Sequence, residues 1–185
     1  MRMSKQGFSA YELVNQYTER ELADIFFRYG EESYARQIAK KIVNERAERS
    51  IETTLQLAEV IKSALPPAVR RKDKHPARKV FQAIRIEVNG ELTALDEALD
   101  QIVALLNPGG RLCVITFHSL EDRLVKQKIR EWETACTCPP EFPVCVCRGK
   151  AKVRRITKKP TTPTESEIKR NPRSRSAKLR ICEKI

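Results

Sequence analysis

The chain has 185 residues, of which 41% are hydrophobic and 32% charged, and its formal net charge is +12. These values are typical of a soluble globular protein and exclude a largely disordered chain. No apolar run approaches the roughly 20 residues that a membrane span needs, and residues 1–6 are not followed by the apolar stretch of a signal peptide. We therefore expect a cytoplasmic protein that does not bind membranes.

Positive charge is concentrated in the last fifth of the chain. Residues 148–185 contain 14 Lys/Arg and three Asp/Glu, whereas the preceding 147 residues contain 22 basic and 21 acidic residues. This local excess favours a polyanionic partner, because a protein that neutralises phosphates releases their counterions. The alternative is a solvated segment that only promotes solubility.

Residues 1–76 have the pattern of an all-α subdomain followed by a basic connector. Three hydroxyl residues are each followed three positions later by Glu or Gln, which is the capping-box signature of a helix start (residues 9–12, 18–21 and 53–56). Gly30 predicts a helix end, since glycine accepts the left-handed conformation common there. Apolar residues at helical spacing predict a further helix over about 31–48.

Residues 77–185 have an α/β pattern. A long helical region over about 77–106, with a possible break at Asn89 and Gly90, is followed by the almost continuously apolar run 112–117. Such a run is typical of a strand buried on both faces in a parallel sheet. Another helix opens near Ser119, and residues 153–157 and 178–182 are two further candidate strands.

The segment 118–123 directly follows the first predicted strand and combines chemically useful side chains. Ligands of open α/β sheets bind beyond the carboxyl ends of strands, and a helix start there offers backbone donors. His118, Glu121 and Asp122 are therefore candidate acids or bases, and Arg123 is a candidate phosphate ligand. In the alternative interpretation, Ser119 and Asp122 merely cap the helix. The sequence has no glycine-rich loop of the kind that cradles phosphates.

Six cysteines without a secretory signal argue against a disulfide framework. Cys113 and Cys182 lie in strand-like runs, and we expect both to be buried thiols. The other four cluster in the loop 136–147 and are candidate ligands of a structural zinc ion, although their pairwise spacing is tighter than in common zinc knuckles. Free or redox-active thiols are the alternative. The four residues are Cys136, Cys138, Cys145 and Cys147.

Several segments, taken in order, resemble the MraW/RsmH family of ribosomal RNA cytosine-N4 methyltransferases. The most specific are the Phe-His-Ser segment 117–123 and the Arg/Ser-rich segment 171–180. The resemblance also includes residues 1–3, 51–54, 75–77, 81–86, 107–112 and 157–160.

This resemblance implies the C-terminal portion of a class I (Rossmann-like) S-adenosylmethionine-dependent methyltransferase with an inserted all-α subdomain. The implied activity is methylation of the N4 amino group of a decoding-centre cytosine in 16S rRNA. The N-terminal cofactor-binding half of the family pattern does not match this chain, so we assign no cofactor-binding residue here and expect the chain alone to be inactive.

Methylation of N4 needs a base held out of its stack and a group that accepts a proton. We expect His118, Glu121 and Asp122 to serve that step, and basic residues to bind the RNA of the small ribosomal subunit. A non-enzymatic, zinc-stabilised RNA-binding module is the alternative function, and a helical protein-interaction domain ranks last. The candidate RNA-binding residues are Arg2, Arg123, Lys158, Lys159, Arg170, Arg173, Arg175 and Lys178.

Overall fold

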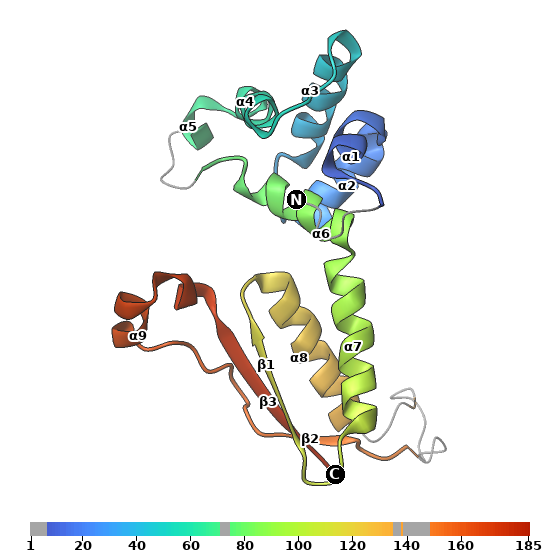
Figure 1. The fold of residues 1–185 in the computed structure, drawn as a ribbon, viewed down its shortest axis with the longest axis vertical. Helices are drawn as coiled ribbons and strands as arrows, with labels where there is room; N and C mark the ends of the chain where they lie inside the picture. The colour runs from blue at the N-terminus through green and yellow to red at the C-terminus, as the bar shows by residue number, and fades with distance from the viewer. Residues whose placement is uncertain (1–6, 71–74, 135–137, 139–148) are drawn as a thin grey trace. The chain divides into compact units, whose positions relative to one another are not determined.

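The computed structural model describes residues 7–70, 75–134, 138 and 149–185, which divide into two compact units at the Glu91–Leu92 bond. Each unit contains its own buried cluster of apolar side chains. The elements are α1 (Ala10–Gln16), α2 (Glu19–Arg28), α3 (Ala35–Glu48), α4 (Thr54–Ala64), α5 (Pro67–Arg70), α6 (Arg78–Asn89), α7 (Glu91–Leu105), β1 (Arg111–Thr116), α8 (Ser119–Glu133), β2 (Val153–Arg155), α9 (Glu165–Arg170), the 3-10 helix η1 (Pro172–Ser176) and β3 (Lys178–Lys184) (Figure 1).

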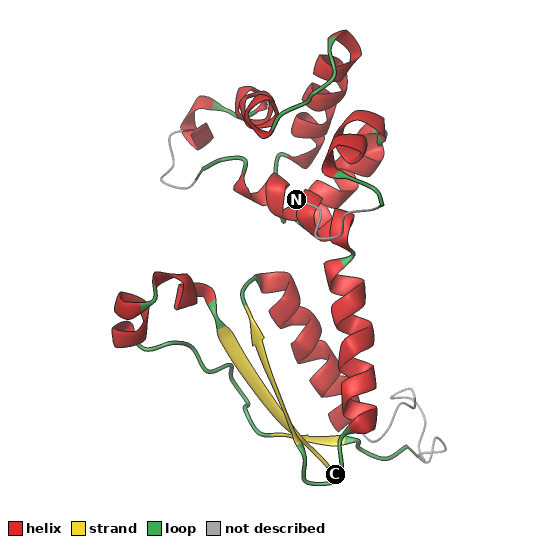
Figure 2. Ribbon diagram, viewed as in Figure 1, coloured by secondary structure: helices red, strands yellow, loops and turns green. Residues whose placement is uncertain are grey.

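The described part of the first unit is helical, as expected from its sequence (Figure 2). All three predicted capping boxes are present, at the starts of α1, α2 and α4. In each box the N-cap hydroxyl accepts the backbone N–H of the residue three positions later, and the side chain of that residue accepts the backbone N–H of the N-cap. These two hydrogen bonds fix where the helix begins. The core between the helices includes the fully buried Leu13, Phe26, Ile38 and Ile61.

Gly30 is needed for a reason that differs from the prediction. The positive φ angle after α2 belongs to Glu31, at 48°, and not to the glycine. A Cβ atom on Gly30 would lie 2.6 Å from the carbonyl oxygen of Phe26 and 2.8 Å from that of Lys79. Glycine is therefore required at this position because α2 and α6 approach closely there.

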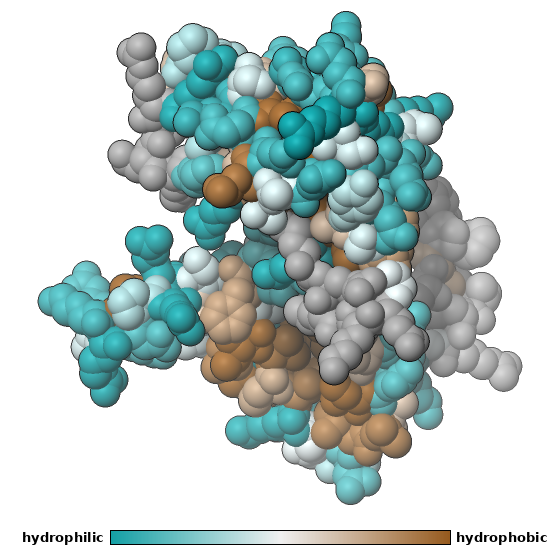
Figure 3. Space-filling model, turned by 45° about the horizontal axis from the view of Figure 1, so that its top comes forward, coloured by the Kyte–Doolittle hydropathy of each residue, from teal (hydrophilic) through white to brown (hydrophobic). Residues whose placement is uncertain are grey.

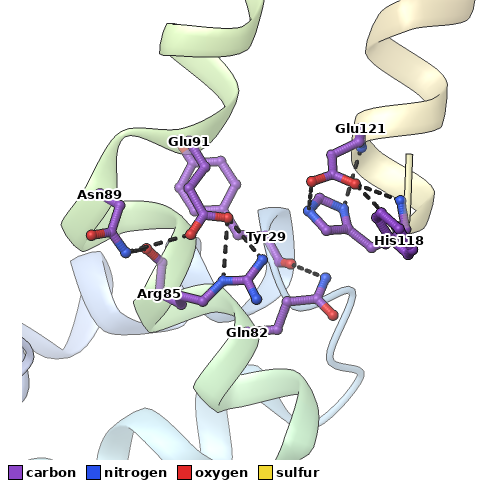
Figure 4. Close-up of polar contacts among 8 residues, drawn as sticks. Tyr29, Gln82, Arg85, Asn89, Glu91, His118 and Glu121 are labelled. Atoms are coloured by element: carbon purple, nitrogen blue, oxygen red, sulfur yellow. Dashed lines mark hydrogen bonds and ion pairs between the residues drawn. The ribbon is translucent and has the colours of Figure 1, made fainter. Parts of the chain in front are cut away.

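The predicted break at Asn89 and Gly90 is confirmed. Gly90 has φ 58° and ends α6 in the left-handed conformation, which carries no Cβ penalty for glycine. Arg85 donates to Oε2 of Glu91 from Nε and from Nη2 over 3.2 and 2.9 Å, and Asn89 donates to the carbonyl of Arg85 over 2.7 Å (Figure 4). These bonds hold the turn between the two helices.

The two compact units divide at the Glu91–Leu92 bond, within the helical region that the sequence predicts after residue 76. Helix α6 contributes Val80, Ala83 and Ile84 to the helical core, so it belongs with the first unit. Helix α7 instead contributes Leu99 and Val103 to the core beside the strands. The connector therefore ends before α6, and the change of core falls at the start of α7.

The second unit contains a three-stranded sheet in the order β1-β3-β2, and both described pairings are antiparallel. All three predicted strands are present, but the expected parallel arrangement is not found among the described strands. Strand β1 is also not buried on both faces: Leu112 and Thr116 are buried, whereas Cys113 and Ile115 are exposed. The prediction of a buried Cys113 is therefore wrong, because its side chain lies on the uncovered face.

Helices α7 and α8 cover one face of this sheet. Leu99, Val125 and Ile129 pack there with residues of all three strands. Asp100 joins the two helices, because it accepts hydrogen bonds from Lys128 Nζ at 2.7 Å and from Trp132 Nε1 at 3.0 Å. In the part of the chain that the structure describes, no helix is long and apolar enough to cross a membrane.

Candidate functional site

The candidate site lies where β1 ends and α8 begins. His118 is the N-cap of α8, with an extended backbone at φ −133° and ψ 166°. Its Nδ1 accepts the backbone N–H of Glu121 at 3.3 Å. In return, Oε2 of Glu121 accepts the backbone N–H groups of Phe117 and His118 at 2.8 and 3.2 Å (Figure 4). In the alternative interpretation of this segment we expect Ser119 to cap the helix, but His118 is the N-cap instead.

The imidazole and the carboxylate of this cap also face each other. Nε2 of His118 lies 3.1 Å from Oε1 of Glu121, and the two side chains are 11% and 23% exposed. The geometry is that of an electrostatic contact, since Nε2 makes no hydrogen bond among the described residues. Because Nδ1 accepts a hydrogen bond, the neutral imidazole carries its proton on Nε2. His118 therefore presents a donor rather than a lone pair at that atom.

Glu121 is a weak base in this setting. Burial alone would raise its pKa, but the His118 side chain and the backbone N–H groups of Phe117 and His118 outweigh burial and lower the pKa to about 2. A general base works best with a pKa near the working pH. Glu121 is therefore better suited to hold His118 and the helix start than to accept a proton.

Asp122 is committed to a buried ion cluster. Its Oδ1 accepts from Arg180 Nε at 2.7 Å, and its Oδ2 accepts from Arg180 Nη2 at 3.1 Å and from Lys178 Nζ at 3.3 Å. These bonds, first among them those from Arg180, lower the pKa of Asp122. The cluster joins the first turn of α8 to β3. Sequence reasoning did not identify Arg180 as a site residue, although a cation between two apolar residues of a predicted strand, Leu179 and Ile181, was a usable signal.

Five of the predicted RNA-binding cations lie on the connection between β2 and β3, which is polar in sequence and contains α9 and η1 in the structure. Their side chains are exposed, and among the described residues no carboxylate lies within ion-pairing distance of them. The pairing of Thr116 with Lys178 places the start of β3 at the end of the sheet where His118 follows β1. Arg173 and Arg175, on η1 directly before β3, therefore lie toward this end, whereas Lys158 and Lys159 lie between Thr157, which bonds Ile181, and Thr161, which bonds Leu179. The five cations are Lys158, Lys159, Arg170, Arg173 and Arg175.

The other predicted RNA-binding residues differ from these five. Lys178 is only partly exposed and pairs with Asp122, so a phosphate would compete with a carboxylate for it. Arg123 is exposed on α8. Arg2 lies outside the described residues.

The proposed zinc site lies mostly outside the described residues, which include Cys138 but not Cys136, Cys145 or Cys147. Cys138 itself is half-buried. Cys182 is buried, as expected, and burial raises the pKa of its thiol to about 11. A thiol of that kind is a poor nucleophile at neutral pH.

Comparison with known proteins covers the whole chain. Residues 1–185 match the model of the MraW methylase family. A ribosomal RNA small subunit methyltransferase H from Paenibacillus sp. (strain JDR-2) is 53% identical over 186 aligned positions, which cover 100% of this chain and 59% of that protein. Proteins of the same name from Brevibacillus brevis and Clostridium botulinum (strain Loch Maree / Type A3) are 51% and 54% identical, again over 100% of this chain and over 59% and 60% of theirs.

The chain thus spans about three fifths of the length of these curated relatives. The match extends through the helical unit, the His118 segment and the basic connection between β2 and β3. The chain belongs to the MraW methylase family.

Proposed function

We propose that this chain is the C-terminal part of an S-adenosylmethionine-dependent enzyme that methylates the N4 amino group of a decoding-centre cytosine in 16S rRNA. Its relatives are named ribosomal RNA small subunit methyltransferases. In this proposal the chain supplies the RNA-binding surface and the helix start at His118, within a class I methyltransferase fold that carries the helical unit as an insertion. The enzyme works in the cytoplasm, where it meets the small subunit.

The observation that carries the proposal is the group of five exposed cations between β2 and β3, which have no carboxylate within ion-pairing distance among the described residues. Folding does not require unpaired cations in one connection, and a phosphate backbone provides the charges that would complement them. Arg173 and Arg175 lie on η1, directly before β3, so a strand of RNA bound there passes close to the start of α8.

The chemistry of the reaction assigns distinct roles to the residues at this end. In this reaction S-adenosylmethionine supplies the methyl group. The glycine-rich loop typical of nucleotide sites is not in this sequence, so we assign no residue of this chain to the cofactor. The lone pair of cytosine N4 is delocalised into the ring, so the base must be held out of its stack and oriented. Glu121 holds the imidazole of His118 at the start of α8, with Nε2 of His118 lying 3.1 Å from Oε1 of Glu121. Asp122 fixes the position of α8 against β3.

RNA binding tests the proposal at the level of this chain. Replacement of Arg173 and Arg175 by alanine should weaken binding of a 16S rRNA fragment and reduce the salt dependence of log K by about 0.7 for each lost phosphate contact. The matched control removes Lys126 and Arg130, two exposed cations of α8. An unchanged salt slope in the first variant, or an equal loss in the control, would contradict the proposed RNA surface.

The alternative, a zinc-stabilised RNA-binding module without enzymatic activity, predicts the same RNA binding. The two functions differ in methyl transfer. A folded full-length protein that contains this chain and binds 16S rRNA, but transfers no methyl group from S-adenosylmethionine, would support the RNA-binding module.

A further inference from the structure

The second unit exposes an aromatic ring beside the candidate site. Phe117 and Trp132 are the Phe, Tyr and Trp residues of this unit that the structure describes, and Trp132 is buried in the core. Phe117 is 56% exposed and lies outside both buried apolar clusters. The core of the unit therefore does not require an aromatic ring at position 117.

The exposure of Phe117 continues the alternation of β1, in which successive side chains point to opposite faces of the sheet. Leu112 and Thr116 are buried, and Leu112 packs in the core with α7 and α8. Cys113 and Ile115 are exposed. Phe117 extends this exposed series by one position, directly after the end of β1. Its ring is therefore not packed beneath the two helices.

The backbone at Phe117 is fixed by the start of α8. The N–H of Phe117 donates to Oε2 of Glu121 at 2.8 Å, and the same oxygen accepts the N–H of His118 at 3.2 Å. The pKa of Glu121 is lowered to about 2, so the carboxylate is ionised near neutral pH and both hydrogen bonds are charge-assisted. A ring on a fixed backbone loses little conformational freedom when a ligand packs on it, which favours binding.

The register of the sheet places Phe117 near the basic helix η1. Thr116 is the last paired residue of β1, and its partner is Lys178, the first residue of β3. Phe117 follows this pair on one segment, while Arg173 and Arg175 of η1 shortly precede it on the other. Figure 3 shows the hydrophilic projection that contains α9 in Figure 1, and beside it an apolar surface of the strand-containing part. An exposed ring and exposed cations thus lie toward the same end of the sheet.

This combination is typical of sites for single-stranded nucleic acid. Such sites hold the phosphate backbone with cations and stack bases on aromatic side chains. A base within a duplex cannot present its face in this way, because its neighbours already stack on it. A ring without nearby cations would fit an apolar partner equally well, so the cations of η1 favour RNA as the ligand.

We propose that Phe117 stacks on an unpaired base of the RNA whose phosphates Arg173 and Arg175 bind, and that this contact makes the site select single-stranded RNA over a duplex. The inference rests on the proposed function in taking 16S rRNA as the ligand, and it adds the residue that determines which form of RNA is bound. The two kinds of side chain carry separate properties. The cations determine the salt dependence of binding, and the ring determines the preference for an unpaired strand.

Binding of two RNAs to the chain separates these contributions. One RNA is a short single strand from the decoding-centre segment of 16S rRNA, and the other is the same strand annealed to its complement. The parent chain should bind the single strand more tightly. Phe117→Leu should weaken binding of the single strand by about tenfold and leave duplex binding and the salt slope unchanged, because it removes a stacking contact and no phosphate contact. Phe117→Tyr keeps a ring and should bind both RNAs as the parent does.

Two controls accompany these variants. Phe27→Leu removes a 66% exposed ring from α2 of the helical unit and should change neither affinity. Urea unfolding followed by Trp132 fluorescence checks that the Phe117 variants are folded.

Several results would overturn the inference: equal binding of the two RNAs by the parent, an unchanged affinity of Phe117→Leu for the single strand, an equal loss for both RNAs, or the same loss in Phe117→Tyr. The variant with Arg173→Ala and Arg175→Ala is measured alongside. A reduced salt slope in that variant, together with no effect of Phe117→Leu, would overturn the role of Phe117 and leave the proposed function standing.

Discussion

Loss of the Asp122 carboxylate should strongly destabilise the second unit. The Asp122 and Arg180 side chains are 11% and 7% exposed, and two hydrogen bonds join them. Alanine at position 122 leaves the guanidinium of Arg180 buried without its counter-charge, which costs about 3–5 kcal/mol. Small domains are stable by about 5–15 kcal/mol, so this loss is a large part of the total. A double variant with Arg180→Met should recover most of the loss, because it removes the uncompensated charge as well.

Urea unfolding followed by Trp132 fluorescence measures this loss selectively. Trp132 is the single tryptophan of the chain and is 5% exposed in the core of the second unit. The matched control is Arg111→Ala, which breaks an ion pair with Glu183 in the same unit, where the Arg111 side chain is 64% exposed. That change should cost at most about 0.5 kcal/mol. An Asp122→Ala variant within about 1 kcal/mol of the parent would refute the reasoning from burial.

Four further predictions concern separate features. Gly30→Ala should lower the stability of the helical unit by about 1–3 kcal/mol, as measured by thermal unfolding followed by circular dichroism, because the added Cβ meets two carbonyl oxygens. In the control Gly90→Ala the added Cβ meets nothing, so this variant should cost only about 1 kcal/mol for its positive φ. Equal effects of the two variants would contradict the close approach of backbone at Gly30. The pKa of Glu121 is lowered to about 2 from 4.5, so its contribution to stability is present above about pH 4.5 and is lost as the pH falls toward 2. Glu121→Gln should therefore reduce the loss of stability at acid pH, as measured by unfolding followed by Trp132 fluorescence. An unaltered pH profile would show that the carboxylate is not held as described. If the four clustered cysteines bind zinc, protein purified without chelator should contain about one equivalent and Cys145→Ser much less, while under about a tenth of an equivalent would rule the site out. Calorimetry should detect no micromolar binding of S-adenosylmethionine to this chain alone, because the sequence has no glycine-rich loop, and clear binding heats would place cofactor residues within it.

Local signals in the sequence predicted most of the elements. Capping boxes and the break at Gly90 depend on a few neighbouring residues, so they could be recognised without the fold. The role of Gly30 could not, because the carbonyl that it approaches belongs to Lys79, far along the chain. The 3-10 helix η1 and the short α9 were also missed, since their polar sequences have no apolar periodicity.

Strand pairing and side-chain roles depended on partners that the sequence does not place. The apolar run of β1 predicts a strand of a parallel sheet, whereas its described partner β3 is antiparallel. Likewise, the acidic residues after His118 looked alike in sequence. The structure separates them: Glu121 completes the helix cap, while Asp122 is neutralised by Arg180, 58 positions later. Neither role follows from residue type alone.

The most direct test of the central claim is the position of the methyl group on 16S rRNA. A fusion of this chain with the portion of the Paenibacillus relative that precedes the matched segment is incubated with S-adenosylmethionine and small ribosomal subunits, and nuclease fragments of the RNA are analysed by mass spectrometry. The proposed function predicts one added methyl group, on N4 of a decoding-centre cytosine, and a much slower reaction for the variant with Arg173→Ala and Arg175→Ala. A folded fusion that binds S-adenosylmethionine but methylates no 16S cytosine, or methylates a different atom, would contradict it.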